Sequence, residues 1–402
     1  MAANLAEMRD SKVEPAGTLA GKRIVMVLSD LELGGAERQA ILLARYLKGE
    51  TGAAVTVVGL ANRGGRAAQI CEQHGIACAC LPPRYPGNLY RTSRWFGWLL
   101  TCFTKTVRRL RPDVLLPYCT FANVTCGLTW RLTGARMCIW NQRDAGITRM
   151  NPLLERCAAW LTPCFVTNST AGAICLQEAY RIAPERIHHI SNGLELSPPE
   201  ANRATWRKRL RLAENQFAAC MLANLHKNKD HATLIRAWRL VVDQFPTDQP
   251  SPVLLLAGRW SNQADSLRDL ANELGVFDEV RFLGAVDDVS GLLRAVDLKV
   301  LSSVREGCPN AVLEAMAVGL PVVATDNPGT RDVLGEDAQE FLVPPRDENA
   351  LAAIVLAIAR DPARRQDSGR KNHYRVESVF TAEEMVRGYL RLFREYIGQG
   401  GR

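Results

Sequence analysis

Two glutamates eight positions apart, Glu306 and Glu314, frame the part of the sequence best suited to chemistry. They lie in REGCPNAVLEAMAVG (305–319), which follows a short apolar run. Pro309 is tolerated at the first position of a helix, where its missing N–H would have no partner anyway. Gly319 predicts the end of that helix. The free amides of the first helical turn form an anion site, and a diphosphate suits them.

The two carboxylates have different places relative to this helix. Glu314 lies about one turn inside it, and its side chain would point back toward the amino end. Glu306 projects from the preceding loop. The spacing therefore suits a nucleotide sugar, with the phosphates on the helix, the ribose on Glu314 and the sugar hydroxyls near Glu306. Taken alone, the pair is also described by an exposed loop glutamate and a helical glutamate near a favourable dipole end.

Parallel sheets must position this segment, because continuous apolar runs alternate with helical patterns along almost the whole chain. A polar, proline-bearing stretch at 197–208 separates two such series. The sequence therefore predicts an α/β protein with two doubly wound domains, whose ligands lie at the carboxyl ends of strands and in the crevice between. We predict strands at 23–28, 54–60, 76–81, 113–118, 137–141 and 164–168, then at 217–225, 252–258, 280–284, 297–303 and 320–325.

The chain is expected to have five parts and a cytoplasmic setting. Its first residues lack the basic start and apolar run of a signal peptide, and no apolar run approaches the roughly 20 residues that span a bilayer. The 12 cysteines form neither a C-x-x-C pair nor a Cys/His cluster, which favours a reducing compartment. The predicted parts are a flexible tail (1–20), a first domain (21–196), a linker (197–215), a second domain (216–380) and a final helix with its tail (381–402).

Together with the two-glutamate segment, four further segments resemble the retaining GT-B glycosyltransferases of family 4. The resemblance extends over about residues 22–397. It implies two Rossmann-like domains, the first binding the acceptor and the second the nucleotide sugar, and a carboxy-terminal helix that crosses back to the first domain. The four segments are GGAERQAILLARYL (34–47), CFVTNSTAGAICL (164–176), IHHISNGLEL (187–196) and MLANLHKNKDHATLIRAW (221–238).

The resemblance also implies roles for single residues. Glu314 would bind the ribose and Glu306 the hydroxyls of the donor sugar. Lys229 would neutralise the diphosphate, including the charge that builds on the leaving group. Backbone near Phe282 would contact the base. Other donor-binding positions would be Gly34, Gly35, Asn224, Arg259, Phe282, Gly307, Cys308, Pro309, Asn310 and Ala311.

Several of these positions have a plainer interpretation or depart from the family pattern. Gly34 and Gly35 could form only a strand-to-helix turn. Many relatives carry an arginine where this chain has Asn224, and Arg259 is either its replacement or a rim charge. Many relatives also carry a histidine after the strand MCIWN, where this chain has Arg143 and Asp144. We name these two as candidate catalytic residues that orient a substrate or accept a proton; they would equally form a structural ion pair.

Charge and aromatic residues in the first half suggest its partners. Residues 1–200 hold 23 Lys and Arg against 15 Asp and Glu, whereas the rest of the chain is balanced. Within 84–111, an apolar stripe including Leu99, Leu100 and Phe103 would cover the sheet, and Trp95 and Trp98 widen it. The extra tryptophans among basic residues also suit an anionic lipid surface. Nucleic acid is not expected, because no recognised binding module is present.

The resemblance implies a retaining hexosyltransferase that uses a nucleotide-diphosphate sugar, with UDP-sugars favoured. The acceptor would be a hydroxyl of a sugar or lipid-linked glycan, in cell-surface polysaccharide or lipid-linked glycan synthesis, and the enzyme would be cytoplasmic or peripheral on the inner membrane face. No D-x-D triplet occurs, so we expect no metal and no cofactor. The alternatives are a weakly active, nucleotide-sugar-binding partner subunit, or another GT-B activity such as an epimerase or phosphorylase. The sequence leaves the acceptor and the oligomeric state open.

Overall fold

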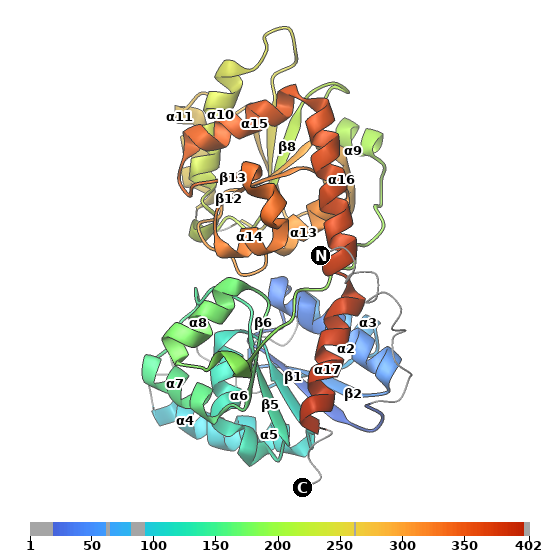
Figure 1. Cartoon of the computed structure of the whole chain (residues 1–402), viewed down its shortest axis with the longest axis vertical. Helices are drawn as coiled ribbons and strands as arrows, with labels where there is room; N and C mark the ends of the chain where they lie inside the picture. Colours follow the sequence, from blue (N-terminus) through green and yellow to red (C-terminus); the bar gives the residue numbers. More distant parts are fainter. Residues whose placement is uncertain (1–18, 62–64, 82–92, 261–262, 398–402) are drawn as a thin grey trace. The chain divides into compact units, whose positions relative to one another are not determined.

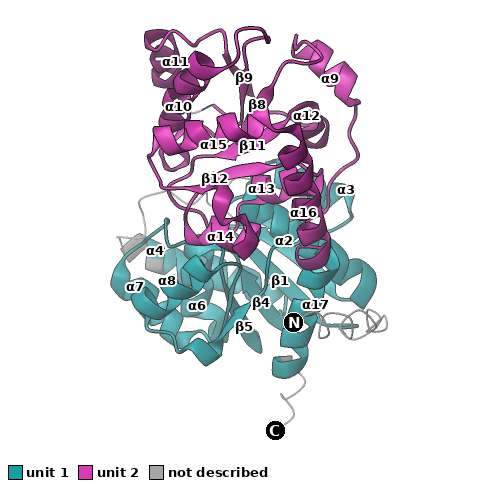
Figure 2. Ribbon diagram, turned by 45° about the horizontal axis from the view of Figure 1, so that its top comes forward, with its two compact units in different colours: residues 1–193, 382–402 teal, residues 194–381 magenta. Residues whose placement is uncertain are grey.

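The fold is taken from a computed structural model that describes residues 19–61, 65–81, 93–260 and 263–397 of the 402-residue chain (Figure 1). The chain divides into two compact units, coloured separately in Figure 2. Unit 1 comprises residues 1–193 and 382–402, and unit 2 comprises residues 194–381. Each unit is a doubly wound α/β domain, as the alternation of apolar and helical patterns predicts. No described helix is long and apolar enough to cross a membrane.

Unit 1 is built on a parallel sheet of seven strands in the order β3-β2-β1-β4-β5-β6-β7. Successive side chains of a strand point to opposite faces, and both faces are buried. Residues from α2, α3 and α17 form the core on one face, and residues from α4 to α8 form the core on the other. The strands are β1 (Arg23–Leu28), β2 (Ala54–Gly59), β3 (Ala77–Cys80), β4 (Val114–Pro117), β5 (Met137–Gln142), β6 (Cys164–Thr167) and β7 (Ile187–His189). The helices are α2 (Gly35–Thr51), α3 (Arg66–Gln73), α4 (Ser93–Trp98), η3 (Leu99–Phe103), α5 (Thr104–Arg109), α6 (Cys119–Thr133), α7 (Pro152–Leu161), α8 (Thr170–Tyr180), η4 (Pro184–Arg186) and α17 (Ala382–Ile397).

Unit 2 has a parallel sheet of six strands in the order β10-β9-β8-β11-β12-β13. The short edge strands β7 and β13 were not among the strands predicted from the sequence. The strands are β8 (Ala218–Leu222), β9 (Val253–Ala257), β10 (Val280–Gly284), β11 (Leu298–Leu301), β12 (Val322–Thr325) and β13 (Leu342–Val343). The helices are α9 (Arg203–Arg209), η5 (Lys227–Lys229), α10 (His231–Gln244), α11 (Ala264–Glu273), α12 (Val289–Ala295), α13 (Asn310–Ala317), α14 (Pro328–Leu334), η6 (Glu336–Phe341), α15 (Glu348–Arg360) and α16 (Pro362–Val379).

The apolar stripe predicted within 84–111 is confirmed at Leu99 and Phe103 and is wrong at Leu100, and residues 84–92 lie outside the described residues. Trp95, Leu99, Phe103 and Val107 are buried, four positions apart, whereas Leu100 is 53% exposed. The reason is the π-helix η3 between α4 and α5, because its wider turn aligns residues that a regular α-helix would rotate apart. Trp95 is therefore a core residue and is not available to a membrane.

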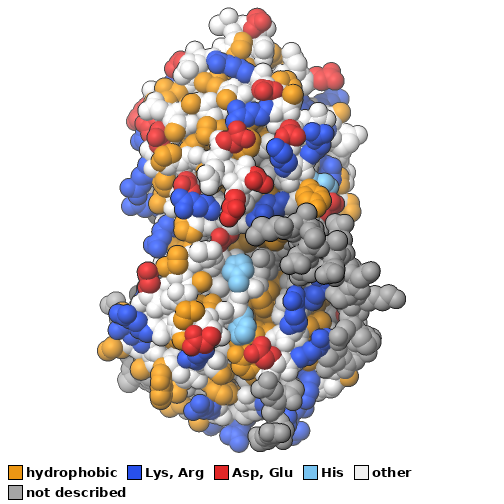
Figure 3. Space-filling view, in the orientation of Figure 1, with side chains coloured by type: hydrophobic (Ala, Val, Ile, Leu, Met, Phe, Trp, Pro, Cys, Tyr) orange, Lys and Arg blue, Asp and Glu red, His pale blue; other side chains and the backbone are white. Residues whose placement is uncertain are grey.

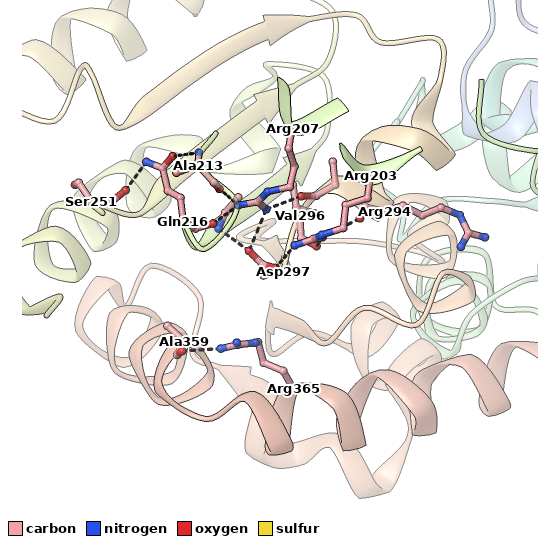
Figure 4. A network of polar contacts seen from close by, with 12 residues as sticks. Arg203, Arg207, Ala213, Gln216, Ser251, Arg294, Val296, Asp297, Ala359 and Arg365 are labelled. Atoms are coloured by element: carbon pink, nitrogen blue, oxygen red, sulfur yellow. Dashed lines mark hydrogen bonds and ion pairs between the residues drawn. The ribbon is translucent and has the colours of Figure 1, made fainter. Parts of the chain in front are cut away.

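The segment 197–215, predicted as a linker, contains helix α9, and arginines fix this helix to unit 2. The Arg207 guanidinium donates to the carbonyl oxygens of Ala295 (2.9 Å) and Gln216 (2.5 Å). Arg203 pairs with Asp297, with Nη2 2.7 Å from Oδ1 (Figure 4). Burial lowers the pKa of Arg207. Much of the expected linker is thus an ordered part of unit 2.

Helix α17 packs on unit 1, as the predicted crossing-back helix requires. The Tyr389 hydroxyl is buried and donates to Asn141 Oδ1 of β5 at 2.5 Å, and it accepts a hydrogen bond from Arg143. At the point where the chain leaves unit 1, the Gln39 side chain pairs with both backbone groups of Gly193, at 2.8 and 3.0 Å. The contacts of Tyr389 thus orient α17 on the sheet, and those of Gln39 fix the end of the unit 1 chain.

Replacing Tyr389 with Phe should lower the free energy of unfolding by about 1–3 kcal/mol, because Arg143 and Asn141 would each lose a buried partner. Urea denaturation of the whole chain measures this change. Tyr396→Phe is the matched control, since that half-buried hydroxyl lies 3.4 Å from His188 Nε2 in a weaker contact. Equal effects of the two substitutions would contradict a special role for Tyr389.

Candidate functional site

The central strands of unit 2 bring the predicted donor residues to one edge of its sheet. Strands β8, β11 and β12 are neighbours and run parallel, so the loops that follow them leave the sheet at the same edge. These loops carry Lys229, Glu306 and the start of α13. Adjacent loops are also bonded directly: the Val304 N–H donates to the Asn228 carbonyl at 3.0 Å.

Lys229 and Glu306 form an ion pair at this edge. Lys229 Nζ lies 2.5 Å from Glu306 Oε1, and both side chains are partly shielded from solvent. The backbone beneath the pair is fixed as well, because the Ser302 hydroxyl lies 3.0 Å from the Lys229 carbonyl and 2.9 Å from the Asp230 carbonyl. A lysine and a glutamate that are 77 residues apart in the sequence are thus held together as an ion pair.

Helix α13 begins one residue later than the sequence predicts, because Pro309 takes the N-cap position and Asn310 is the first helical residue. Glu314 is buried within the helix. The backbone at Gly319 has a φ of +78°, a left-handed conformation that ends the helix where predicted. Of the other predicted donor residues, Gly307 and Pro309 are buried, and Cys308, Asn310 and Ala311 are half-buried around the helix start.

Helix α14 supports the Glu306 loop, a contact that the sequence interpretation missed. A Cβ on Gly329 would lie 2.0 Å from the Gly307 carbonyl oxygen, so only glycine allows the helix start to touch this loop. The Asn327 side chain caps α14 and also donates to the Ser303 carbonyl at 3.2 Å. The sequence NPGT (327–330) carries the usual signals of a helix start, an N-cap Asn followed by Pro, and those signals could have revealed α14.

The Asn224 side chain forms a hydrogen bond with the backbone, and it supplies no charge to the site. Its Oδ1 accepts the Arg259 N–H at 3.0 Å, which ties the loop after β8 to the loop after β9. Arg259 itself is exposed. Phe282 is on β10, where its ring lies 6.5 Å from that of Trp260, and Trp260 was not singled out from the sequence. The neutral residue in place of the family's arginine therefore has a structural use.

The four remaining candidates, Gly34, Gly35, Arg143 and Asp144, belong to unit 1. Gly34 is the N-cap of α2, and the Glu37 carboxylate lies over it, 2.5 Å from where a Cβ would stand. Cys119, which has a φ of +68°, is within electrostatic range of Glu37 and Asp144. The glycine loop and Asp144 therefore share one edge of the unit 1 sheet.

Arg143 and Asp144 do not form the ion pair that was their structural alternative. Asp144 organises its own loop, since its carboxylate accepts from Gln142 Nε2 at 2.7 Å and from two backbone N–H groups at 3.1 Å. Arg143 is buried beneath α17, donates to Asn192 Oδ1 at 3.2 Å and lies 5.0 Å from the Tyr118 ring centroid. Its contacts are those of an anchor for α17. The catalytic roles of both residues stay predictions.

Sequence comparisons identify the family. The family model described as Glycosyl transferases group 1 matches residues 202–374, and the one described as Glycosyltransferase Family 4 matches residues 33–197. By these two matches, the chain belongs to the family 4, group 1 glycosyltransferases. The two matches correspond closely to the core of unit 2 and of unit 1.

Curated relatives of this glycosyltransferase chain are similar over part of their length. The lipopolysaccharide core biosynthesis glycosyltransferase LpsE of Rhizobium meliloti (strain 1021) is 33% identical over 143 residues, 36% of this chain and 42% of the relative. The UDP-Gal:alpha-D-GlcNAc-diphosphoundecaprenol alpha-1,3-galactosyltransferase of Escherichia coli is 25% identical over 191 residues, 47% of this chain and 49% of the relative. The chain thus spans about half the length of the curated relatives it matches.

Solved structures share the fold over nearly the whole chain. Anabaena HepE, in complex with UDP and glucose, superposes with a TM-score of 0.79 at 20% identity and covers 93% of this chain and 100% of its own. Sucrose-phosphate synthase from Thermosynechococcus elongatus gives 0.77 at 19% identity, with 94% and 100% covered. These similarities, together with the two parallel sheets, confirm the predicted GT-B fold.

Replacing Gly329 with Ala should push the Glu306–Gly307 backbone away and destabilise the chain by about 1–3 kcal/mol, because the new methyl group has no room. Thermal denaturation measures the loss. Gly49→Ala in α2 is the control, since a Cβ there meets nothing within 4 Å and should be neutral or stabilising. A Gly329→Ala variant as stable as the Gly49→Ala variant would show that α14 does not constrain the Glu306 loop.

Proposed function

We propose that this glycosyltransferase moves a sugar from a nucleotide-diphosphate sugar, UDP-sugars favoured, to a hydroxyl acceptor with retention of configuration. The observation that carries the proposal is the contact of Lys229 Nζ with Glu306 Oε1, 2.5 Å apart and beside the amino end of α13. A cation, a carboxylate that can face the sugar and the backbone amides of a helix start are the groups that a diphosphate linked to a sugar requires.

Each group has a distinct task in this proposal. The amides at the start of α13 and Lys229 bind the diphosphate, and Lys229 stabilises the charge that develops when the sugar–phosphate bond breaks. Release of Lys229 from Glu306 frees that carboxylate for the sugar hydroxyls. Glu314, buried within the helix, holds the ribose. Because these groups act mainly on the donor, the acceptor is bound elsewhere.

Three similar proteins support the choice of donor and acceptor. HepE has been crystallised in complex with UDP and with UDP-glucose, which favours a UDP-sugar donor here. The Escherichia coli relative transfers galactose from UDP-Gal to a diphosphoundecaprenol-linked sugar, and LpsE acts in lipopolysaccharide core synthesis. We therefore propose a sugar or lipid-linked acceptor in the synthesis of a cell-surface polysaccharide or lipid-linked glycan.

The purified chain should release UDP from UDP-glucose or UDP-galactose when a sugar acceptor is supplied, and Glu306→Gln should lower kcat by about 100-fold or more, as loss of a transition-state contact does. A coupled assay for UDP measures the rate, and NMR of the product measures its anomeric configuration. Arg305→Gln, at the exposed neighbouring position, is the control. UDP binding without turnover across a donor and acceptor panel would instead indicate a partner subunit.

We also propose that donor binding needs no metal, because Lys229 and the helix amides supply the positive charge. Among the described residues, no group of three or more His, Cys, Asp or Glu side chains could hold an ion. Turnover in this assay should therefore persist when EDTA is added. Abolition of turnover by EDTA, with recovery on adding Mg²⁺ or Mn²⁺, would contradict this part of the proposal.

We further propose that unit 1 contacts an anionic membrane through α7. Leu153 is 72% exposed and Trp160 is 78% exposed, and with Arg156 they follow the helical spacing of one face. Hydrophobic side chains are interspersed with Lys and Arg on the visible surface of unit 1 (Figure 3). This face replaces the 84–111 stretch as the candidate lipid contact, because amphipathic and basic surfaces bind anionic lipid.

The chain should sediment with vesicles containing phosphatidylglycerol and much less with pure phosphatidylcholine vesicles, and binding should weaken at high salt. The double substitution Leu153→Ser and Trp160→Ser should lower vesicle binding at least about tenfold, since two large apolar side chains would be lost. Trp260→Ser on unit 2, at a 45% exposed position, is the control. Undiminished binding of the double variant would exclude α7 as the contact.

A further inference from the structure

A lysine is buried in the middle of the unit 2 sheet. Lys299 lies on β11, opposite Cys220 of β8 and Val322 of β12. It is 0% exposed, and among the described residues its Nζ has no hydrogen-bond partner. Lysine is almost never fully buried unless it is paired, because removing an ammonium group from water has a high free-energy cost. Packing alone does not account for a cation at this position.

The charged groups that face Lys299 come from the donor-site elements. Glu314 of α13 and Glu306 of the preceding loop favour its charged form, whereas Lys229 of η5 disfavours it. The Cys220 thiol is neutral near pH 7, because burial raises its pKa to about 11. Burial outweighs these attractions and lowers the Lys299 pKa to about 8. The ammonium form is thus the main one at neutral pH and is lost within the range that enzymes commonly tolerate.

His231 at the start of α10 completes this surrounding. Its ring is buried. Burial, with help from Lys299 and Lys229, lowers its pKa to about 4. His231 is therefore neutral near pH 7, and the charges at this edge are the two lysines and the two glutamates.

We propose that Lys299 is a positioning residue, the buried counter-charge that allows the Glu306, Glu314 and Lys229 cluster to accept a nucleoside diphosphate. This inference rests on the proposed function. When Lys299 is charged, the two lysines balance the two carboxylates. When Lys299 is neutral, the cluster has a net negative charge and repels the diphosphate. A bound diphosphate in turn favours the charged form of Lys299, so binding and protonation are coupled.

Folding and binding respond to Lys299 with opposite signs. Its folded pKa of about 8 lies below the ordinary value of 10.5, so the unfolded chain binds more protons between these two values. The contribution of Lys299 to stability therefore rises as pH increases from 8 toward 10.5. Diphosphate affinity falls over the same range, because the buried cation is lost. If Lys299 acted only in packing, its titration would change the stability of the chain and leave the diphosphate affinity unchanged.

Proton uptake on binding of UDP, measured by titration calorimetry of the whole chain in HEPES and Tris buffers at pH 8, tests the proposal. At this pH about half of Lys299 is protonated, so binding should take up about 0.4 proton if it raises the pKa by a unit or more. The uptake should shrink at pH 7 and vanish in Lys299→Met.

That variant should bind UDP about tenfold more weakly at pH 7, as expected for the loss of one nearby favourable charge. It should also be more stable than the parent chain below pH 8, since a buried, unpaired charge has been removed.

The outcomes separate this inference from the proposed function. UDP binding by the parent chain without proton uptake at pH 8, or with the same uptake in Lys299→Met, would overturn the role of Lys299 and leave the proposed function standing. Failure of the folded parent chain to bind UDP or UDP-glucose would instead contradict the proposed function. The parent measurement needs no variant, so the test holds even if Lys299→Met does not fold.

Discussion

The close contact between Lys229 and Glu306 depends on the order of strands in the unit 2 sheet. The two residues are 77 positions apart, and they meet because β8 and β11 are parallel neighbours whose following loops leave at one edge. Around this pair the chain adds rigid backbone contacts from Ser302 and Gly329, and buried charge from Glu314 and Lys299. The proposed chemistry is thus a consequence of parallel-sheet topology and of charges that the sheet partly shields from water.

The polar side chains at the sheet edges of the two units have different contacts. In unit 2, charged side chains of opposite sign face one another and can exchange partners with a charged ligand. In unit 1, the Asp144 carboxylate accepts hydrogen bonds within its own loop, and Arg143 donates to Tyr389 of α17. This difference fits a division in which unit 2 binds the charged donor while unit 1 offers a preformed backbone frame. It also explains why Tyr389, far along the sequence, matters to the β5 edge.

Much of the fold could be predicted from the sequence, because long apolar strands and helix signals are local. The end of α13 at Gly319 and the eleven predicted strands follow from such signals, whereas the return of α17 to unit 1 was implied by the family resemblance. Edge strands β7 and β13 were missed since three and two residues carry too little pattern. The π-helix η3 before α5 was also missed. It changes which residues between 93 and 109 are buried, because the predicted stripe assumed the period of a regular α-helix. The partners of Asn224 and Arg143 are set by tertiary contacts, so the sequence could name these residues without assigning their use.

Hydrogen–deuterium exchange of the whole chain with and without UDP tests the central claim most directly, that a nucleoside diphosphate binds at the start of α13. UDP should slow exchange of the amides in residues 306–312 and 226–231, because these groups would bind the ligand or be covered by it. Slowed exchange confined to unit 1, or unchanged exchange in both segments at a UDP concentration that saturates binding, would contradict the account.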